Sequence, residues 1–234
     1  MTWIKICGNT NLDDARAAIE AGADAVGFVF SAGSRRQVTP EAVREIVRQL
    51  PPAVEKIGVF ADQEIEAVWR TVHEAGLTGV QFHGHETVRL MRRFVQLGEV
   101  EAAGTRAGEA GAETGFRKPF LIKAIPVGGD AYSAARWAVG GEDFLDAVLL
   151  DSSRPGGSGQ TFDWQAAEEF ALDLGQRHRL IVAGGLTPAN VTEAISILRP
   201  WGVDVVSGVE REPGRKEHGR IREFVAAVKE VNSG

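Results

Sequence analysis

The sequence predicts an α/β protein, a single-domain (β/α)8 barrel, and three observations carry that prediction. Short β-branched apolar runs alternate along the chain with amphipathic runs, a pattern typical of parallel strands joined by helices. Eight such strand–helix units follow one another, and eight is the number that closes this kind of barrel. The chain has 234 residues, which is enough for one substantial core.

Each unit pairs one predicted strand with the helix that follows it. In chain order the strands are expected at residues 3–7, 25–30, 54–60, 79–84, 120–125, 146–151, 180–185 and 203–208. The helices are expected at residues 12–20, 40–50, 65–75, 88–95, 131–139, 164–172, 189–198 and 221–231. Because apolar strands of this kind are buried on both faces, the helices should surround the sheet.

Capping residues mark several of the helix starts. Asn11, Thr39, Asp163 and Thr187 each carry a side-chain oxygen that can accept a hydrogen bond from the first turn of a helix. Proline follows both threonines, and proline is favoured at the first helical position. These four residues are therefore predicted N-caps.

One segment, residues 96–118, departs from the alternation. It is rich in Gly, Ala and Glu and poor in large apolar residues, so we interpret it as a mobile insertion. It follows the fourth predicted helix and precedes the fifth strand, so it should emerge on the N-terminal face of the barrel. Barrels of this type do their chemistry on the opposite face.

Composition excludes several classes of function. The net charge of -6 leaves no surplus of cations for nucleic-acid phosphates. No apolar run approaches the ~20 residues that span a bilayer, so we expect a soluble protein that does not bind membranes. A single cysteine forms no internal disulfide, and the N-terminus shows no signal-peptide pattern, so a cytoplasmic location is expected.

The chain's only cysteine ends the first predicted strand. Side chains alternate along a strand, so Trp3, Lys5 and Cys7 should share the interior face. Cys7 is then the last inward residue, at the C-terminal mouth, beside Gly8, whose missing side chain leaves room for a ligand. A small core hydrophobe is the alternative interpretation, but this position favours a catalytic thiol.

The sixth predicted strand ends on a carboxylate by the same rule. Ala147, Leu149 and Asp151 should alternate inward, which brings Asp151 to the mouth that Cys7 occupies. Aspartates at strand ends often cap helices, but Asp163 is the natural cap of the following helix. Asp151 is therefore a candidate catalytic residue.

Glycines cluster after the last three predicted strands. Exposed backbone N–H groups after strands seven and eight, with a short helix behind them, commonly hold a phosphate in this architecture. The candidate phosphate-binding residues are Gly157, Gly159, Gly184, Gly185, Ser207 and Gly208. The run from Gly157 to Gly159 lacks the third glycine of a dinucleotide fingerprint, so a nicotinamide site is not expected.

Arginine and histidine pairs add further polar groups at the mouth. An arginine fork suits a planar carboxylate, so one of Arg35 and Arg36 is a candidate carboxylate ligand and the other is expected to be solvated. His83 and His85 have no visible third ligand, so no metal is expected, and His83 is predicted to line the mouth.

Two lysines lie inside predicted strands. Lys5 and Lys123 are interpreted as interior charges. An unpaired buried ammonium is costly, so each should be paired with a group such as Asp204.

The motifs taken together resemble those of the phosphoribosylanthranilate isomerase family over nearly the whole chain. They are "KICGNTNLDDA", "GADAVGFVF", "SRR", "QFHG", "LLDSS" with "GGSGQTFDW", "AGGLTPANV" and "VDVVSGVEREPGRKEHGRIREFV". The family is a TIM barrel of tryptophan biosynthesis that performs an Amadori rearrangement. The resemblance implies Cys7 as general base, Asp151 as general acid and Arg36 as the ligand of the anthranilate carboxylate.

The chemistry of that reaction accounts for these residue types. Opening the aminofuranose needs a proton on the ring oxygen, which a positioned carboxylic acid supplies. The imine that results acidifies the neighbouring C–H, and a thiolate can remove that proton. The thiolate is expected to gain from loop N–H groups near Gly8 and Asn9. No cofactor is required, the ligand is a phosphorylated small molecule, and a monomer or homodimer is expected.

The sequence departs from the family pattern at Ala183, where some members have serine, at Val206, which replaces a common serine, and in the 96–118 insertion, which is longer than usual. The two substitutions lie near the expected phosphate, so they are expected to alter side-chain hydrogen bonds and the affinity there while leaving the backbone donors. Two alternatives stay open. One is another phosphosugar barrel isomerase of the histidine-pathway type, which uses two aspartates, and the other is a catalytically silent barrel kept as a scaffold.

Overall fold

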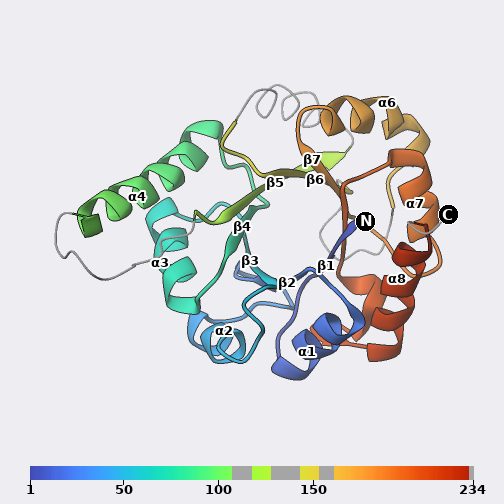
Figure 1. Cartoon of the computed structure of the whole chain (residues 1–234), viewed down its shortest axis with the longest axis horizontal. Coiled ribbons are helices and arrows are strands. Elements are labelled where there is room, and N and C mark those ends of the chain that lie inside the picture. Colours follow the sequence, from blue (N-terminus) through green and yellow to red (C-terminus); the bar gives the residue numbers. More distant parts are fainter. Residues whose placement is uncertain (107–117, 128–142, 153–160, 232–234) are drawn as a thin grey trace.

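The computed structural model describes residues 1–106, 118–127, 143–152 and 161–231, with side chains omitted from 101–106. Strands β1 to β8 pair in chain order and close into a barrel. β1 completes the ring by pairing in parallel with β8, in a register that sets Lys5 against Asp204. Figure 1 shows the helices around the outside of these strands. The predicted single (β/α)8 barrel is confirmed.

The strands match the predicted positions closely. They are β1 (Trp3–Ile6), β2 (Ala25–Val29), β3 (Glu55–Phe60), β4 (Gly79–Phe82), β5 (Phe120–Val127), β6 (Ala147–Ser152), β7 (Arg179–Val182) and β8 (Gly202–Val205). After β8 the chain forms a short 3-10 helix, η1 (Ser207–Val209), and a small hairpin of β9 (Glu210–Glu212) and β10 (Arg215–Lys216) that the sequence pattern did not predict.

The described helices are α1 (Leu12–Ala21), α2 (Pro40–Val47), α3 (Ile65–Ala75), α4 (Val88–Arg106), α6 (Trp164–Gly175), α7 (Val191–Leu198) and α8 (His218–Val231). The helix predicted at residues 131–139 lies outside the described residues. Within the described part of the chain, no helix has the length and apolarity needed to cross a bilayer.

Three of the four predicted caps are confirmed. Asn11, Thr39 and Asp163 each accept a hydrogen bond from the first turn of their helix. The prediction for Thr187 was wrong: the Asn190 Oδ1 accepts from the Thr187 backbone N at 2.7 Å, and α7 begins after Asn190. The Asn190 backbone N, which a threonine cap would have served, donates instead to the Thr187 carbonyl at 3.3 Å.

The end of α4 was also predicted wrongly. The helix continues to Arg106, eleven residues beyond the expected end at Val95, so the first part of the 96–118 segment is helical. Ala and Glu are strong helix formers, and Leu97 packs against the core. Residues 107–117 lie outside the described residues, so the mobility of the segment stays a prediction.

Two apolar layers lie on the two faces of the sheet. The larger layer, between strands and helices, contains Ile4 and Ile6. The smaller layer fills the barrel with Ala25, Ile57, Ile122, Ala124, Ala147, Leu149, Ile181 and Ala183. At the starts of the strands, Trp3 stacks on Trp201 with ring centroids 5.1 Å apart. The inward alternation predicted for β1 and β6 is therefore confirmed.

The prediction for Lys123 is confirmed in part: the side chain is buried and paired, but it does not point into the barrel. Its neighbours Ile122 and Ala124 point into the barrel, so Lys123 points to the helix side of β5. There its Nζ contacts the Glu86 Oε2 at 2.9 Å and donates to the Gly84 carbonyl at 2.7 Å. This buried pair holds the loop after β4 against β5.

Candidate active site

A cavity of about 430 Å³ opens at the C-terminal ends of the strands. Its lining brings together seven of the predicted site residues: Cys7, Arg36, His83, Asp151, Gly184, Gly185 and Ser207. Gln81, Asp204 and the apolar side chains of Val29, Val59, Leu186 and Val206 complete much of the wall. Gly157 and Gly159 lie outside the described residues.

Cys7 follows the last residue of β1 and is 3% exposed. Its side chain has room only because β2 carries a glycine opposite it. A Cβ atom on Gly27 would lie 2.4 Å from the Cys7 Sγ, far inside van der Waals contact. Gly27 was not singled out from the sequence, because a glycine inside a strand signals a close approach without naming the partner.

Burial and nearby charges act in opposite directions on the Cys7 thiol. Burial raises the pKa of Cys7 above its ordinary value, and the Asp204 carboxylate raises it further. The ammonium groups of Lys5 and Lys216 oppose this increase without cancelling it. The thiol is therefore the resting form, and the two lysines limit the cost of making the thiolate.

The expected help from loop N–H groups is not available from Asn9. Its backbone N donates to the Gly27 carbonyl at 3.0 Å. Gly8 also differs from expectation: it has a φ of +76°, and a Cβ there would lie 2.8 Å from the Arg36 Cδ. The space beside Gly8 is therefore occupied by the Arg36 side chain and not by a ligand.

Lys5 is paired as predicted, inside the barrel beneath Cys7. Its Nζ donates to the Asp204 Oδ2 at 2.9 Å and to the Gln81 Oε1 at 2.7 Å. Burial alone disfavours the ammonium, but Asp204 and Cys7 together outweigh it and the pKa of Lys5 is raised. Among the described residues, the buried Asp204 Oδ1 has no hydrogen-bond partner, so it is free to accept a hydrogen bond from a ligand in the cavity.

Asp151 lies near the end of β6 with its side chain 18% exposed. The Ser152 backbone N donates to its Oδ1 at 2.7 Å, and the His83 Nε2 lies 3.2 Å from its Oδ2. Gly184 packs against this carboxylate: it has a φ of +81°, and a Cβ there would lie 2.7 Å from the Asp151 Oδ1. Only glycine fits that position without strain.

A chain of hydrogen bonds assigns the tautomer of His83. The Lys5 Nζ only donates, so Gln81 must present its oxygen to Lys5 and its amide nitrogen to His83. The Gln81 Nε2 lies 2.8 Å from the His83 Nδ1, which must then accept. The ring proton is therefore on Nε2, where it is directed at Asp151. His85, by contrast, is 96% exposed and contacts Asp62 at 3.0 Å.

Arg36 is buried at the rim of the cavity and Arg35 is exposed, as expected for one member of the pair. The Arg36 Nε donates to the Glu210 Oε1 at 2.9 Å, and its Nη2 donates to the Oε2 at 2.6 Å. This hydrogen bonding raises the pKa of Arg36, so the guanidinium is charged at all relevant pH values.

The loops after β7 and β8 pack directly on each other. Gly184 and Gly185 have φ values of +81° and +69°, and Ser207 begins η1. A Cβ on Gly208 would lie 1.9 Å from the Leu186 carbonyl oxygen, so Gly208 lies behind the lining and permits this contact. Ala183 and Val206 also line the cavity.

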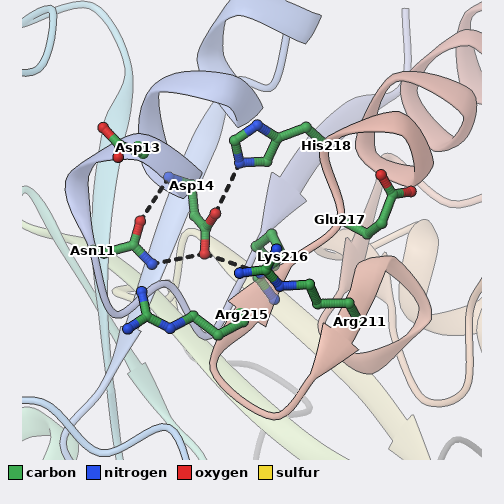
Figure 2. A pocket seen from close by; sticks show the side chains of 8 residues that line it. All are labelled: Asn11, Asp13, Asp14, Arg211, Arg215, Lys216, Glu217 and His218. Carbon is green, nitrogen blue, oxygen red and sulfur yellow. Dashed lines mark hydrogen bonds and ion pairs between the residues drawn. The ribbon is translucent and has the colours of Figure 1, made fainter.

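A second cleft, of about 350 Å³, lies between the start of α1 and the hairpin. Figure 2 shows Asp14 at its centre with dashed contacts to Asn11, Lys216 and His218. Asp14 accepts from the Asn11 Nδ2 at 2.7 Å and from the Lys216 backbone N at 2.9 Å. Its other oxygen lies 2.9 Å from the His218 Nε2. This carboxylate is already satisfied, so the cleft is structural.

Sequence reasoning missed Gln81, Glu210 and Lys216. Gln81 has the same strand parity as His83, so alternation along β4 was a usable signal. Glu210 and Lys216 lie on the hairpin after β8, where no periodic pattern applies. Within the described part of the chain, no three or more His, Cys, Asp or Glu side chains gather as metal ligands.

Comparison with known proteins agrees with this geometry. A family model described as N-(5'phosphoribosyl)anthranilate (PRA) isomerase matches residues 4–104 and 121–227. An N-(5'-phosphoribosyl)anthranilate isomerase from Geobacter sp. (strain M21) is 40% identical over 236 residues, which cover 99% of this chain and 100% of the relative.

Solved structures are similar over the same extent. Phosphoribosyl anthranilate isomerase in complex with reduced 1-(o-carboxyphenylamino)-1-deoxyribulose 5-phosphate is 34% identical, with a TM-score of 0.79 over 98% of this chain and 100% of the other. Monomers generated from the dimeric enzyme of Thermotoga maritima are 34% identical, with a TM-score of 0.78 over the same shares. The chain therefore belongs to the N-(5'-phosphoribosyl)anthranilate isomerase family.

Proposed function

We propose that Cys7 and Asp151 divide the two proton transfers of the reaction that this tryptophan-biosynthesis isomerase catalyses. That reaction is the Amadori rearrangement of N-(5'-phosphoribosyl)anthranilate to 1-(2-carboxyphenylamino)-1-deoxyribulose 5-phosphate. The observation that carries the proposal is one cavity that has a buried thiol and a carboxyl group on its wall, with an arginine and two glycine loops around them.

The first step opens the sugar ring. Asp151, in its acid form, gives its proton to the ring oxygen while the lone pair of the anilino nitrogen forms a C=N bond and the ring C–O bond breaks. The Nε2–H of His83 and the Ser152 N–H are directed at the carboxylate that remains. These donors stabilise the negative charge that the transfer leaves on Asp151.

The second step moves a proton from carbon to the base. The Cys7 thiolate removes the proton at the carbon next to the C=N bond, and the electrons of that C–H bond form the enolamine that rearranges to the ketone. Because burial raises the pKa of Cys7, only a minor fraction is thiolate at neutral pH. The neighbouring Lys5 ammonium keeps that fraction from falling further.

The two ends of the substrate give orientation. Arg36 binds the anthranilate carboxylate, and the loops after β7 and β8 bind the phosphate through Gly184, Gly185, Ser207 and Gly208, with Gly157 and Gly159 of the preceding loop. Binding energy gained far from the reacting carbon holds it against both catalytic groups.

The proposal extends to assembly and location. A monomer or homodimer is proposed, since a relative from Thermotoga maritima is dimeric. A cytoplasmic location is proposed because the single cysteine forms no internal disulfide.

The decisive experiment follows the fluorescence of freshly generated phosphoribosylanthranilate after adding the enzyme. We expect the fluorescence to decay at an enzyme-dependent rate, with no turnover of the histidine-pathway aminoaldose under identical conditions. Preference for the histidine-pathway substrate would favour that isomerase class, and inactivity on both would favour a scaffold. A crystal soaked in phosphate should hold an anion at the loops after β7 and β8, and an anion only elsewhere would contradict the phosphate assignment.

A further inference from the structure

We propose that Glu210 is a positioning residue that fixes Arg36 so that one free edge of its guanidinium faces the cavity and selects a substrate bearing a carboxylate. The inference rests on the proposed function, since it deepens the role given there to Arg36. It concerns a side chain of the hairpin that does not itself line the cavity.

The guanidinium contacts define which edge is free. Glu210 accepts from Nε at 2.9 Å and from Nη2 at 2.6 Å. A guanidinium carries five N–H groups, and this pairing uses the Nε–H and one N–H of Nη2. The two N–H groups of Nη1 and the second of Nη2 remain, and one N–H from each of these nitrogens forms the adjacent edge. Among the described residues, Nη1 has no hydrogen-bond partner.

That free edge matches a planar carboxylate. Two parallel N–H groups, one from each terminal nitrogen, bind two carboxylate oxygens bidentately. Arg36 borders the cavity and Glu210 does not, so the edge held by Glu210 faces the protein. A guanidinium held on one edge keeps little rotational freedom, so binding the substrate carboxylate costs little further ordering.

Glu210 is itself held by the hairpin. The Lys216 Nζ and the Gly214 backbone N both lie 3.2 Å from its Oε1. Lys216 Nζ also donates to the carbonyl of Cys7 at 2.5 Å and to that of Val206 at 3.0 Å. Its backbone N is bound by Asp14, as Figure 2 shows. The hairpin is thus attached to the starts of both α1 and the β1–α1 loop.

Arg36, Glu210 and Lys216 form a buried cluster whose net charge favours the binding of one anion. Burial lowers the pKa of Lys216, and the Glu210 carboxylate opposes that decrease. The Lys216 Nζ has three acceptors, two carbonyls and a carboxylate, which requires all three hydrogens of an ammonium. Burial opposes the ionised form of Glu210, but Arg36 and Lys216 outweigh it and the pKa of Glu210 is lowered. Two cations and one anion leave a net charge of about +1 in a desolvated place, which a bound carboxylate neutralises.

The test measures equilibrium binding of two inhibitors and so does not depend on turnover. One is the reduced product analogue made from ribose 5-phosphate and anthranilate, and the other is its counterpart made from aniline, which lacks the carboxylate. Calorimetry gives Kd for both with the wild type, with Glu210→Gln, and with Glu212→Gln, an exposed control on the same strand.

The wild type and Glu212→Gln are expected to prefer the carboxylated inhibitor by about 10- to 100-fold, the range of a charge-assisted pair. Glu210→Gln should lose most of that preference while its Kd for the aniline compound stays within about 2-fold, since the phosphate end is untouched. Equal weakening of both inhibitors would mark a merely structural role, and an unchanged preference would also overturn the proposal.

A second variant keeps the test independent of folding. Glu210→Asp retains the charge and shortens the reach, so it should also reduce the preference, and a full wild-type preference in that variant would overturn the positioning role. If the wild type itself showed no preference for the carboxylated inhibitor, the assignment of Arg36 under the proposed function would fail. A preference insensitive to both Glu210 variants would overturn only the positioning role of Glu210 and leave the assignment of Arg36 intact.

Discussion

Cys7 and Asp151 line the same cavity from the ends of β1 and β6, and their surroundings differ in burial and in charge. Cys7 is 3% exposed and lies among fixed charges, with Lys5, Lys216 and Asp204 all acting on its pKa. The Asp151 side chain is 18% exposed. Its contacts among the described residues are the His83 ring and a backbone N–H.

This difference predicts that substitutions near Cys7 and substitutions near Asp151 will have different effects. Near Cys7, buried ion pairs both stabilise the barrel and change the pKa of the thiol. Substitutions there should therefore affect stability and activity together. Asp151 makes few contacts among the described residues, so substitutions there should affect activity and leave stability nearly unchanged. Four substitutions test this contrast, starting with the largest expected effect.

Removing the thiol should have the largest effect on turnover. Cys7→Ala is expected to lower kcat by about 10³-fold or more, because it removes the proposed base and general-base catalysis is worth roughly that much. Inhibitor binding should persist, because the substrate's two ends bind elsewhere. Cys7→Ser should also be severely impaired, since a hydroxyl is a much weaker base. A Cys7→Ala enzyme retaining more than about a tenth of wild-type kcat would show that the base lies elsewhere.

Asp151→Asn should lower kcat by about 10²-fold, in the lower part of the range for general-acid catalysis. Its Tm should stay close to the wild-type value, in contrast to variants on the Cys7 side. The pH profile of kcat/KM is expected to be bell-shaped, with one limb that requires the Cys7 thiolate and one that requires protonated Asp151. Asp151→Asn should lose the Asp151 limb and keep the Cys7 limb, and Asp13→Asn on the exposed surface is the control. A profile with both limbs at near wild-type rate would refute the general-acid role.

Lys5→Met tests the fixed charges of the Cys7 side. Lys5 lowers the pKa of Cys7 while burial and Asp204 raise it, so removing Lys5 should raise that pKa further and move the thiolate-dependent limb to higher pH. Activity at neutral pH should fall about 10-fold for each pH unit of that movement. The chain has one cysteine, so thiolate absorbance in the ultraviolet reports this titration directly.

The same substitution should destabilise the fold. It leaves the buried Asp204 carboxylate without its cation, which costs about 3–5 kcal/mol. Adding Asp204→Asn should recover much of the free energy of unfolding, because it removes the unpaired charge. Denaturant titration of the single and double variants measures this. If Lys5→Met changed neither the thiolate-dependent limb of the pH profile nor the stability, Lys5 would control neither the pKa of Cys7 nor the stability of the fold.

Strand alternation explains why so much of the inner site was predictable. Period-two counting placed Lys5, Cys7 and Asp151 on the barrel interior, and the Lys5–Asp204 pair followed from the cost of a buried charge. Lys123 shows the limit of charge-based reasoning, because strand parity, and not charge, decides which face a residue takes.

The hairpin contacts were beyond the reach of sequence patterns. Arg36 meets Glu210 across 174 positions of sequence, and Lys216 meets Cys7 across 209. No period or motif predicts such pairs, because these residues become neighbours only when β1 pairs with β8 and closes the barrel. The need for glycine at position 27 is likewise apparent only when the Cys7 Sγ is placed beside it.

Asp14→Asn should have the smallest effect on turnover, and it tests how far the rigidity of the Cys7 side depends on the hairpin. Burial opposes ionisation of Asp14, but hydrogen bonds from the Lys216 backbone, His218 and Asn11 outweigh it and lower its pKa. A lowered folded-state pKa stabilises the fold above the unfolded value of about 3.9 and loses that contribution as the pH falls through the folded value. The wild type should therefore be more stable than Asp14→Asn by about 1 kcal/mol at neutral pH, with the difference shrinking below about pH 4.

Chemical denaturation at several pH values measures this difference in stability. The kcat of Asp14→Asn, measured alongside, should stay within about 3-fold of the wild-type value. A large loss of kcat at unchanged stability would mean that Asp14 acts on Cys7 through Lys216, so that the base would depend on the cleft of Figure 2 as well as on the barrel interior.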